Sequence, residues 1–283
     1  MKSKIYSTLL LSTLVLAACQ NAPVDDTEDD TDADQSEQVE TDNDEQELDE
    51  TDEDAENVEE TEEPEEAEEV TFKYQINPNT FSVEHINPEE AGDEKLVLLT
   101  YDDAPYGNTM EIAEALDERG VSAIFFVNTM YMDDTEGYET IQEVHEMGFE
   151  IANHTHTHAK LDDYTQEDQY EEIMTTNDII EEAIGVRPRF FRAPHGVMTD
   201  YAEQVVWDDG MTWMNWSFGY DWNLEYQDAA ALTDITLNTE LLGNGANILM
   251  HDRTWTAAAA PAIVDGLLEQ GFTIVDPKYI AHE

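Results

Sequence analysis

The sequence predicts an α/β protein, a distorted (β/α) barrel, either complete or incomplete, with about seven βα units. Short apolar runs alternate with helix-like stretches from residue 96 onward. Such short runs, separated by helical patterns, are typical of buried parallel strands. Polar residues follow several of the runs, as expected at the C-terminal ends of barrel strands.

Seven runs are the predicted strands. They are LVLLT (96–100), SAIFFV (122–127), FEIA (149–152), RFFR (189–192), MTWMNW (211–216), ANILM (246–250) and FTIV (272–275). Helices are predicted between them, for example at 108–120 and at 166–185. These two stretches end at Gly120 and Gly185, and glycine favours the C-terminal end of a helix.

The first 19 residues are predicted to be a secretory signal peptide. Two lysines precede an apolar run from Ile5 to Ala18, which is shorter than the roughly 20 residues of a membrane-spanning helix. The segment LAAC (16–19) resembles a bacterial lipobox, whose cysteine, here Cys19, is lipidated after cleavage. An ordinary signal peptide with a stray cysteine is the alternative. Because Cys19 is the only cysteine, disulfides within the chain are excluded.

The rest of the chain is predicted to be a disordered acidic tether (20–70), an irregular lead-in (71–94) and a folded domain (95–283). Residues 21–70 contain 27 acidic residues and no lysine or arginine, so they bury too little apolar surface to fold. Fully extended, this tether would reach at most roughly 165–180 Å. The formal charge of -57 argues against nucleic acid or an anionic lipid surface as a partner.

Polar residues converge on the C-terminal ends of five predicted strands. They are Tyr101-Asp102-Asp103, Asn153 to His158, Arg192 to His195, Asp221-Trp222 and His251-Asp252-Arg253. A packed barrel needs none of these charges for its stability. Their convergence therefore indicates an active site.

The stretch HTHTH (154–158) places three histidines at alternating positions. If the chain turns helically after its strand, His154 and His158 share one face and His156 points away. Two imidazoles and one carboxylate would give the open geometry of a catalytic zinc site. Of the adjacent Asp102 and Asp103, one could ligate the metal while the other takes a proton from water.

Five motifs together resemble the polysaccharide deacetylases of the NodB-homology type, carbohydrate esterase family 4, over roughly residues 95–280. They are TYDDAP (100–105), HTHTH (154–158), RAPHG (192–196), Asp221-Trp222 and Leu249-Met250-His251. The resemblance implies a divalent metal ion, with zinc expected, held by Asp103, His154 and His158. It also implies Asp102 as the catalytic base and Arg192 as the group that orients this base.

The remaining motif residues are implied to serve the acid and the substrate groove. By the resemblance, His251 is the general acid and Asp221 tunes it. Trp222 is implied to flank the groove, and Leu249 to line the acetyl pocket. The backbone N–H of His195 is implied to stabilise an oxyanion.

Three positions depart from the family's motifs. Ala104 stands in place of the usual glycine, and His195 in place of a common tyrosine. Phe218 or Gly219 stands where the DxxDW motif has its first aspartate. The last departure affects the expected substrate contacts more than the chemistry.

The implied function is metal-dependent removal of N-acetyl groups from a cell-wall or surface polysaccharide, with release of acetate. Peptidoglycan amino sugars are the expected substrate of a monomer that is lipid-anchored on the extracellular face of a bacterial membrane. The alternatives are an O-acetyl esterase acting on xylan and a deacetylase of chitin or exopolysaccharide. A non-catalytic glycan-binding protein is a further alternative, but binding alone would not need Asp102, Arg192 and His251.

Overall fold

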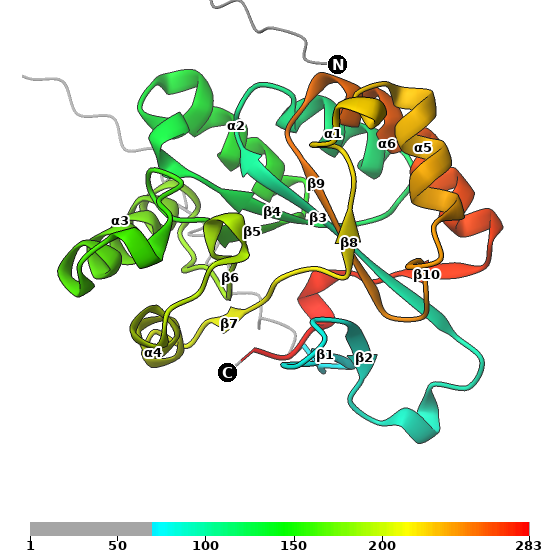
Figure 1. Ribbon diagram of the computed structural model, residues 1–283, viewed down its shortest axis with the longest axis horizontal. Coiled ribbons are helices and arrows are strands. Elements are labelled where there is room, and N and C mark those ends of the chain that lie inside the picture. Colours follow the sequence, from blue (N-terminus) through cyan, green and yellow to red (C-terminus); the bar gives the residue numbers. More distant parts are fainter. Residues whose placement is uncertain (1–69, 283) are drawn as a thin grey trace, which may run out of the picture. The chain divides into compact units, whose positions relative to one another are not determined.

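Eight parallel strands form the central sheet of the computed structural model, which describes residues 70–282 (Figure 1). They are β3 Lys95–Ala104, β4 Ile124–Val127, β5 Glu150–Asn153, β6 Phe190–Phe191, β7 Thr212–Trp213, β8 Phe218–Gly219, β9 Ala246–His251 and β10 Phe272–Ile274. The predicted signal peptide, Cys19 and the tether as far as residue 69 lie outside the described residues. In the described part of the chain, no helix is long and apolar enough to cross a membrane.

The strand order in this sheet is β7-β6-β5-β4-β3-β9-β8, with β10 paired to the first residues of β3. Within residues 70–282, the outermost strands β7 and β8 are not paired with each other. The sheet therefore stays open, and the incomplete form of the predicted barrel is confirmed. All strand ends that carry predicted site residues point to the same edge, because every pairing in the sheet is parallel.

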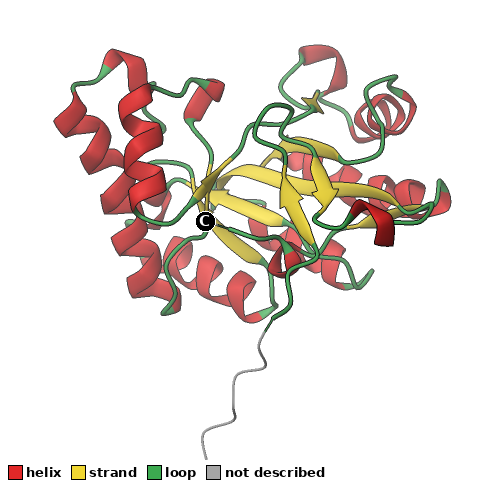
Figure 2. Ribbon diagram, turned by 90° about the horizontal axis from the view of Figure 1, so that it is seen from below, coloured by secondary structure: helices red, strands yellow, loops and turns green. Residues whose placement is uncertain are grey.

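Helices lie around the outside of the sheet (Figure 2). They are α1 Thr109–Asp117, α2 Thr135–Glu146, α3 Gln166–Ile184, α4 Asp200–Asp208, α5 Ala229–Asn238 and α6 Thr254–Glu269. The predicted end of α3 is confirmed, since Gly185 caps it in the left-handed conformation with a φ of 75°. Helix α1 ends slightly before the predicted glycine, and Gly120 lies in the turn that follows.

Strand β3 is buried on both faces, which explains its uninterrupted apolar sequence. Val97 and Leu99 pack in the cluster that also contains residues of α1 and α6. Leu96 and Leu98 point to the opposite face and pack in a second cluster with the N-terminal segment. Two covered faces hold this strand firmly, and it carries Asp102 and Asp103 to the edge of the sheet.

Residues 71–94, expected to be irregular, contain an antiparallel hairpin of β1 Tyr74–Ile76 and β2 Val83–His85. Val83 is buried in the second cluster, and its N–H donates to the carbonyl of Gly245 at 2.9 Å. A Cβ on Gly245 would lie 2.5 Å from the Val83 oxygen, so only glycine permits this approach. The expectation of an irregular segment is wrong here because three-residue strands are too short to give a clear alternating pattern.

The predicted strand at 211–216 is wrong in its extent. Strand β7 covers only two of its residues, and the chain then crosses to the opposite edge of the sheet to form β8. The carbonyls of Met214 and Asn215 accept hydrogen bonds from the Arg192 guanidinium, at 3.3 and 3.1 Å. A buried arginine thus replaces the next strand as the hydrogen-bonding partner of this segment.

Candidate metal and catalytic site

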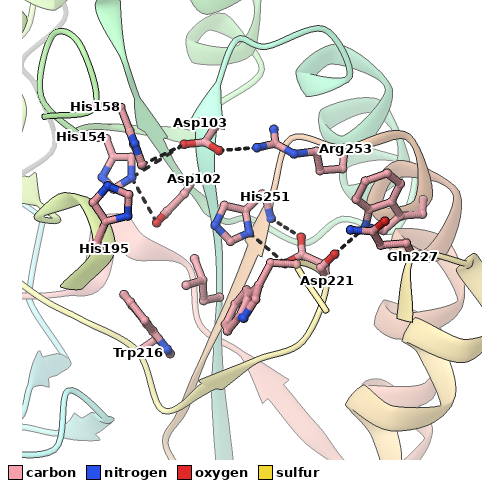
Figure 3. Close-up of a pocket in the computed structure, with 13 residues that line it drawn as sticks. Asp102, Asp103, His154, His158, His195, Trp216, Asp221, Gln227, His251 and Arg253 are labelled. Carbon is pink, nitrogen blue, oxygen red and sulfur yellow. Dashed lines mark hydrogen bonds and ion pairs between the residues drawn. The ribbon is translucent and has the colours of Figure 1, made fainter. Parts of the chain in front are cut away.

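An open pocket of about 560 Å³ lies at the C-terminal edge of the parallel strands (Figure 3). Of the predicted site residues in the described part, all except Arg192 line this pocket: Asp102, Asp103, His154, His158, His195, Asp221, Trp222, Leu249 and His251. Gln227, to which no sequence pattern pointed, also lines it, as does Arg253, which was placed at a strand end but given no role. Arg253 follows His251-Asp252 directly, and this position was the available signal.

Asp103, His154 and His158 each offer one ligand atom, and these atoms lie within 4.8 Å of one another. Asp103 Oδ1 is 3.5 Å from His158 Nε2 and 3.9 Å from His154 Nε2. His154 Nδ1 lies 2.8 Å from the carbonyl of Arg192, so Nδ1 carries the proton and Nε2 presents its lone pair to the cluster.

The protonation of His158 also favours metal binding. Burial, reinforced by the neighbouring His154, lowers the pKa of His158 to about 4. The His158 imidazole is therefore neutral near pH 7, in the form that binds a metal. Two imidazole nitrogens and one carboxylate oxygen are the protein ligands of many catalytic zinc sites, so these residues fit a divalent metal such as zinc.

His154 and His158 meet through an irregular loop and not through the helical turn that the spacing suggested. Residues 154–158 contain no helix, and Thr155 and His158 have left-handed backbone conformations, with φ of 67° and 59°. His156 does not line the pocket, and its Nδ1 lies 2.9 Å from Thr129 Oγ1. Of the three alternating histidines, two are metal-ligand candidates and the third anchors the loop.

Asp103 is oriented by an arginine from the neighbouring strand end. Arg253 Nη2 donates to Asp103 Oδ2 at 2.6 Å, so Oδ1 is the oxygen that faces the histidines (Figure 3). Burial alone would raise the pKa of Asp103. The charges of the nearby imidazoles and of Arg253 outweigh burial and hold this pKa below its usual value.

Asp102, the predicted base, is buried and paired with Arg192. Arg192 Nη1 donates to Asp102 Oδ1 at 2.7 Å and to Thr100 Oγ1 at 2.9 Å, and its guanidinium is completely buried. Asp102 Oδ2 lies on the other side, 3.5 Å from His154 Nε2. The arginine thus fixes one carboxylate oxygen and leaves the other facing the metal ligands.

His251, the predicted acid, is held by Asp221. Its Nδ1 lies 2.8 Å from Asp221 Oδ1, and its backbone N–H donates to Asp221 Oδ2 at 2.5 Å. Thr256 Oγ1 donates to the carboxylate of the same aspartate, and Trp255 Nε1 donates to its backbone carbonyl. These bonds put the proton on Nδ1 and leave His251 Nε2 as the atom that can exchange a proton with a substrate.

The three departures from the motifs lie at different places around this site, one in the pocket wall and two buried in strands. The His195 ring contacts the His158 ring, with centroids 4.7 Å apart, so it forms part of the pocket wall. Ala104 is the buried last residue of β3, and Phe218 is buried in β8. The proposed role of the His195 N–H toward an oxyanion stays a prediction.

Replacing His154 or His158 with alanine is expected to abolish tight zinc binding, because each change removes one of three protein ligands. Competition with a chromophoric chelator measures the zinc affinity. His156→Ala is the comparison variant, since it removes an imidazole outside the pocket that anchors the loop but is no ligand, and it should weaken binding much less. A loss of affinity in His156→Ala as large as in the other two variants would contradict this ligand assignment.

Comparison with known proteins agrees with the site. A family model described as polysaccharide deacetylase matches residues 89–214. A chitooligosaccharide deacetylase of Sinorhizobium fredii is 30% identical over 195 residues, which cover 63% of this chain and 88% of the relative. Peptidoglycan-N-acetylmuramic acid deacetylase PdaC of Bacillus subtilis is 30% identical over 188 residues, 65% of this chain and 38% of the relative.

A solved structure has the same fold. The family 4 carbohydrate esterase from Streptomyces lividans, in complex with acetate, superposes with a TM-score of 0.58 and 31% identity, covering 64% of this chain and 91% of that chain. The chain spans less than two fifths of the length of the first curated relatives that it matches, which include bifunctional xylanase/deacetylases. The match covers 88% of the length of the Sinorhizobium relative and 91% of the Streptomyces structure. The chain therefore belongs to the polysaccharide deacetylase family.

Proposed function

We propose that this protein hydrolyses N-acetyl groups of a cell-wall or surface polysaccharide, with peptidoglycan amino sugars as the substrate, and releases acetate. One observation carries the proposal. Asp102 and His251 are paired in register on the adjacent strands β3 and β9, beside the cluster of Asp103, His154 and His158. The proposed base and acid therefore line one pocket beside the metal-ligand candidates, an arrangement that suits metal-assisted amide hydrolysis.

A zinc ion held by Asp103, His154 and His158 would act as a Lewis acid and lower the pKa of water toward roughly 7. Asp102 accepts the proton of the attacking water on Oδ2, while Arg192 holds Oδ1. His251 Nε2 donates a proton to the departing amine, since Nδ1 is engaged by Asp221. The products are acetate and a free amino sugar.

Asp221→Asn is expected to shift the alkaline limb of the pH–rate profile to lower pH. Burial lowers the pKa of His251, but the hydrogen bond to Asp221 and the negative charge of Asp221 outweigh burial, so the net pKa is raised. A raised pKa keeps the acid protonated to higher pH, and removing the charge reverses this gain. Profiles of kcat/KM against pH measure the shift, and an unchanged alkaline limb would contradict this role of Asp221.

A second pocket suggests that the substrate is an oligomer rather than a single sugar. This pocket, also of about 560 Å³, includes Tyr106 and Tyr131, whose rings are in edge contact. The Arg253 guanidinium, which lines the first pocket, lies 4.9 Å from the centre of the Tyr106 ring. The two pockets are therefore neighbours, and the exposed Tyr106 ring offers an apolar face to a further sugar.

KM is therefore expected to fall with oligomer length. Tyr106→Ala should raise KM for N-acetylglucosamine tetramers or longer oligomers and leave KM for the dimer nearly unchanged, whereas Tyr106→Phe should behave as wild type for both. Acetate release at varied substrate concentration provides these constants. Equal effects of Tyr106→Ala on dimer and tetramer would show that the second pocket binds no sugar.

Attachment to the outer face of the membrane through Cys19, with the acidic segment as a spacer, is part of the proposal. The sequence LAAC (16–19) and the acidic run 21–70 support it. Cell fractionation is expected to find the wild-type protein with the membrane and the Cys19→Ser protein released from it. Equal release of both proteins would contradict lipid anchoring. Sedimentation of the purified chain tests the expected monomer.

An O-acetyl esterase is the second candidate, since the chain's curated relatives include a bifunctional xylanase/xylan deacetylase. Acetate release from peptidoglycan and N-acetylglucosamine oligomers, compared with release from acetylated xylan, distinguishes the two. The proposal requires faster release from the amide substrates. Release from xylan alone would favour the esterase, and glycan binding without any release would favour the non-catalytic alternative.

A further inference from the structure

The two histidine ligands are held in place very differently. His154 directly follows β5, and its Nδ1 is hydrogen-bonded to the Arg192 carbonyl. The half-buried His158 lies farther along the loop. Its ring lies against Asp103 and the rings of His154 and His195, and no hydrogen bond from a backbone group to this ring is among its contacts in residues 70–282. The position of His158 therefore depends on the backbone that leads to it.

That backbone is strained and needs contacts to hold it. Thr155 and His158 both have left-handed conformations, which are unfavourable for residues other than glycine and persist only where surrounding contacts impose them. Asn128 from the neighbouring strand end donates to the carbonyls of His154 and Thr155. These bonds fix the first half of the loop and leave the second half to other partners.

Glu172 of helix α3 holds the second half at Thr157, beside the contacts that His156 makes with Thr129 and Met130. The Thr157 N–H donates to Glu172 Oε2 at 2.8 Å, and the Thr157 hydroxyl donates to Glu172 Oε1 at 2.6 Å. The N–H of His156 donates to the backbone carbonyl of the same glutamate at 3.1 Å. One residue thus binds both residues that precede His158.

The burial of Glu172 argues that this contact is more than a surface pair. Glu172 is 9% exposed, whereas its neighbour Glu171 is exposed. A carboxylate in such a position is costly unless both oxygens are hydrogen-bonded, and Thr157 supplies a bond to each oxygen. Bonds to a charged acceptor are also stronger than those between neutral groups.

We infer that Glu172 is a positioning residue of the metal site, which holds His158 at coordinating distance by fixing Thr157. It touches neither the metal ligands' ring atoms nor the substrate pocket, and it acts through the backbone. This role rests on the metal site of the proposed function but not on its substrate. Groups that orient metal ligands typically change metal affinity 10–100-fold when removed.

Zinc affinity of the full chain, measured by competition with a chromophoric chelator, tests this role. Glu172→Ala is expected to weaken zinc binding at least about tenfold, toward the lower end of the range for orienting groups. Glu172→Gln should weaken it by no more than about threefold, because its amide can still bond both groups of Thr157. Glu171→Ala removes the same charge one residue away and should bind zinc as wild type does.

The visible absorption of the cobalt(II) form gives a second readout, since its bands report ligand number and geometry. Glu172→Ala should change these bands, and Glu172→Gln should retain them. If Glu172→Ala does not fold, Thr157→Val, which removes one of the two side-chain bonds at an exposed position, should still weaken zinc binding. Wild-type zinc affinity in a folded Glu172→Ala protein, or in Thr157→Val, would overturn the inference.

Failure of this inference and failure of the proposed function are distinguishable, because zinc affinity is measured without substrate. A zinc-loaded wild-type protein that releases no acetate would reject the deacetylase and leave the role of Glu172 standing. A Glu172→Ala protein that releases acetate at the wild-type rate and binds zinc with wild-type affinity would reject the role of Glu172 and leave the deacetylase standing.

Discussion

Replacing Asp102 with asparagine is expected to lower the turnover of acetate release by roughly 10²–10⁴-fold, the usual contribution of a general base. The amide keeps the size of the side chain but cannot accept the proton at Asp102 Oδ2. Zinc affinity should stay close to the wild-type value, because Asp103, His154 and His158 are unchanged. Asp102→Asn with wild-type turnover would show that another group is the base.

The same substitution should also destabilise the fold. Arg192 is completely buried, and Asp102 is its carboxylate partner at 2.7 Å. A buried charge that loses its partner typically costs about 3–5 kcal/mol, somewhat less here because asparagine retains an acceptor oxygen. Denaturant unfolding measures this cost. The double variant Asp102→Asn with Arg192→Met should be destabilised by less than the sum of the two single changes.

His251→Ala is expected to lose roughly 10²–10⁴-fold in turnover on N-acetyl substrates while retaining zinc. An amine leaves poorly unless it is protonated. His251 lines the pocket, is not a metal-ligand candidate and does not pack against His158, so it is the imidazole available to supply the proton. The imidazole is mostly buried and pairs with the completely buried Asp221, so its removal should also cost some stability.

A substrate with a better leaving group separates the acid from the base. With 4-nitrophenyl acetate, whose leaving group needs no proton, His251→Ala should lose little activity, whereas Asp102→Asn should lose as much as on the amide. Equal losses of the two variants on both substrates would contradict the division of roles between Asp102 and His251.

Much of this site could be predicted from sequence because it depends on strand ends. Strands β3, β5 and β9 are largely apolar and parallel, and parallel strands deliver the residues at and just after their C-terminal ends to one edge. The positions of Asp102, His154 and His251 in one pocket follow from this rule. The family resemblance then adds the roles that spacing alone leaves open.

The parts that sequence reasoning missed depend on contacts between distant segments. The loop at 154–158 is not a helical turn, since Asn128 and Glu172 hold it in a path whose left-handed residues no local pattern reveals. The crossing from β7 to β8 depends on Arg192, a residue about 20 positions earlier that satisfies the carbonyls of the crossing segment. Arg253 acquires its place beside Asp103 only when β9 pairs with β3.

Zinc-dependent acetate release from N-acetylglucosamine oligomers is the most direct test of the central claim. The purified chain would be assayed as prepared, after removal of metal with a chelator, and after zinc is added back. The claim predicts release that is lost on chelation, restored by zinc and absent from His154→Ala under all three conditions. Release that is unaffected by chelation, or equal in wild type and His154→Ala, would contradict a metal-dependent deacetylase built on Asp103, His154 and His158.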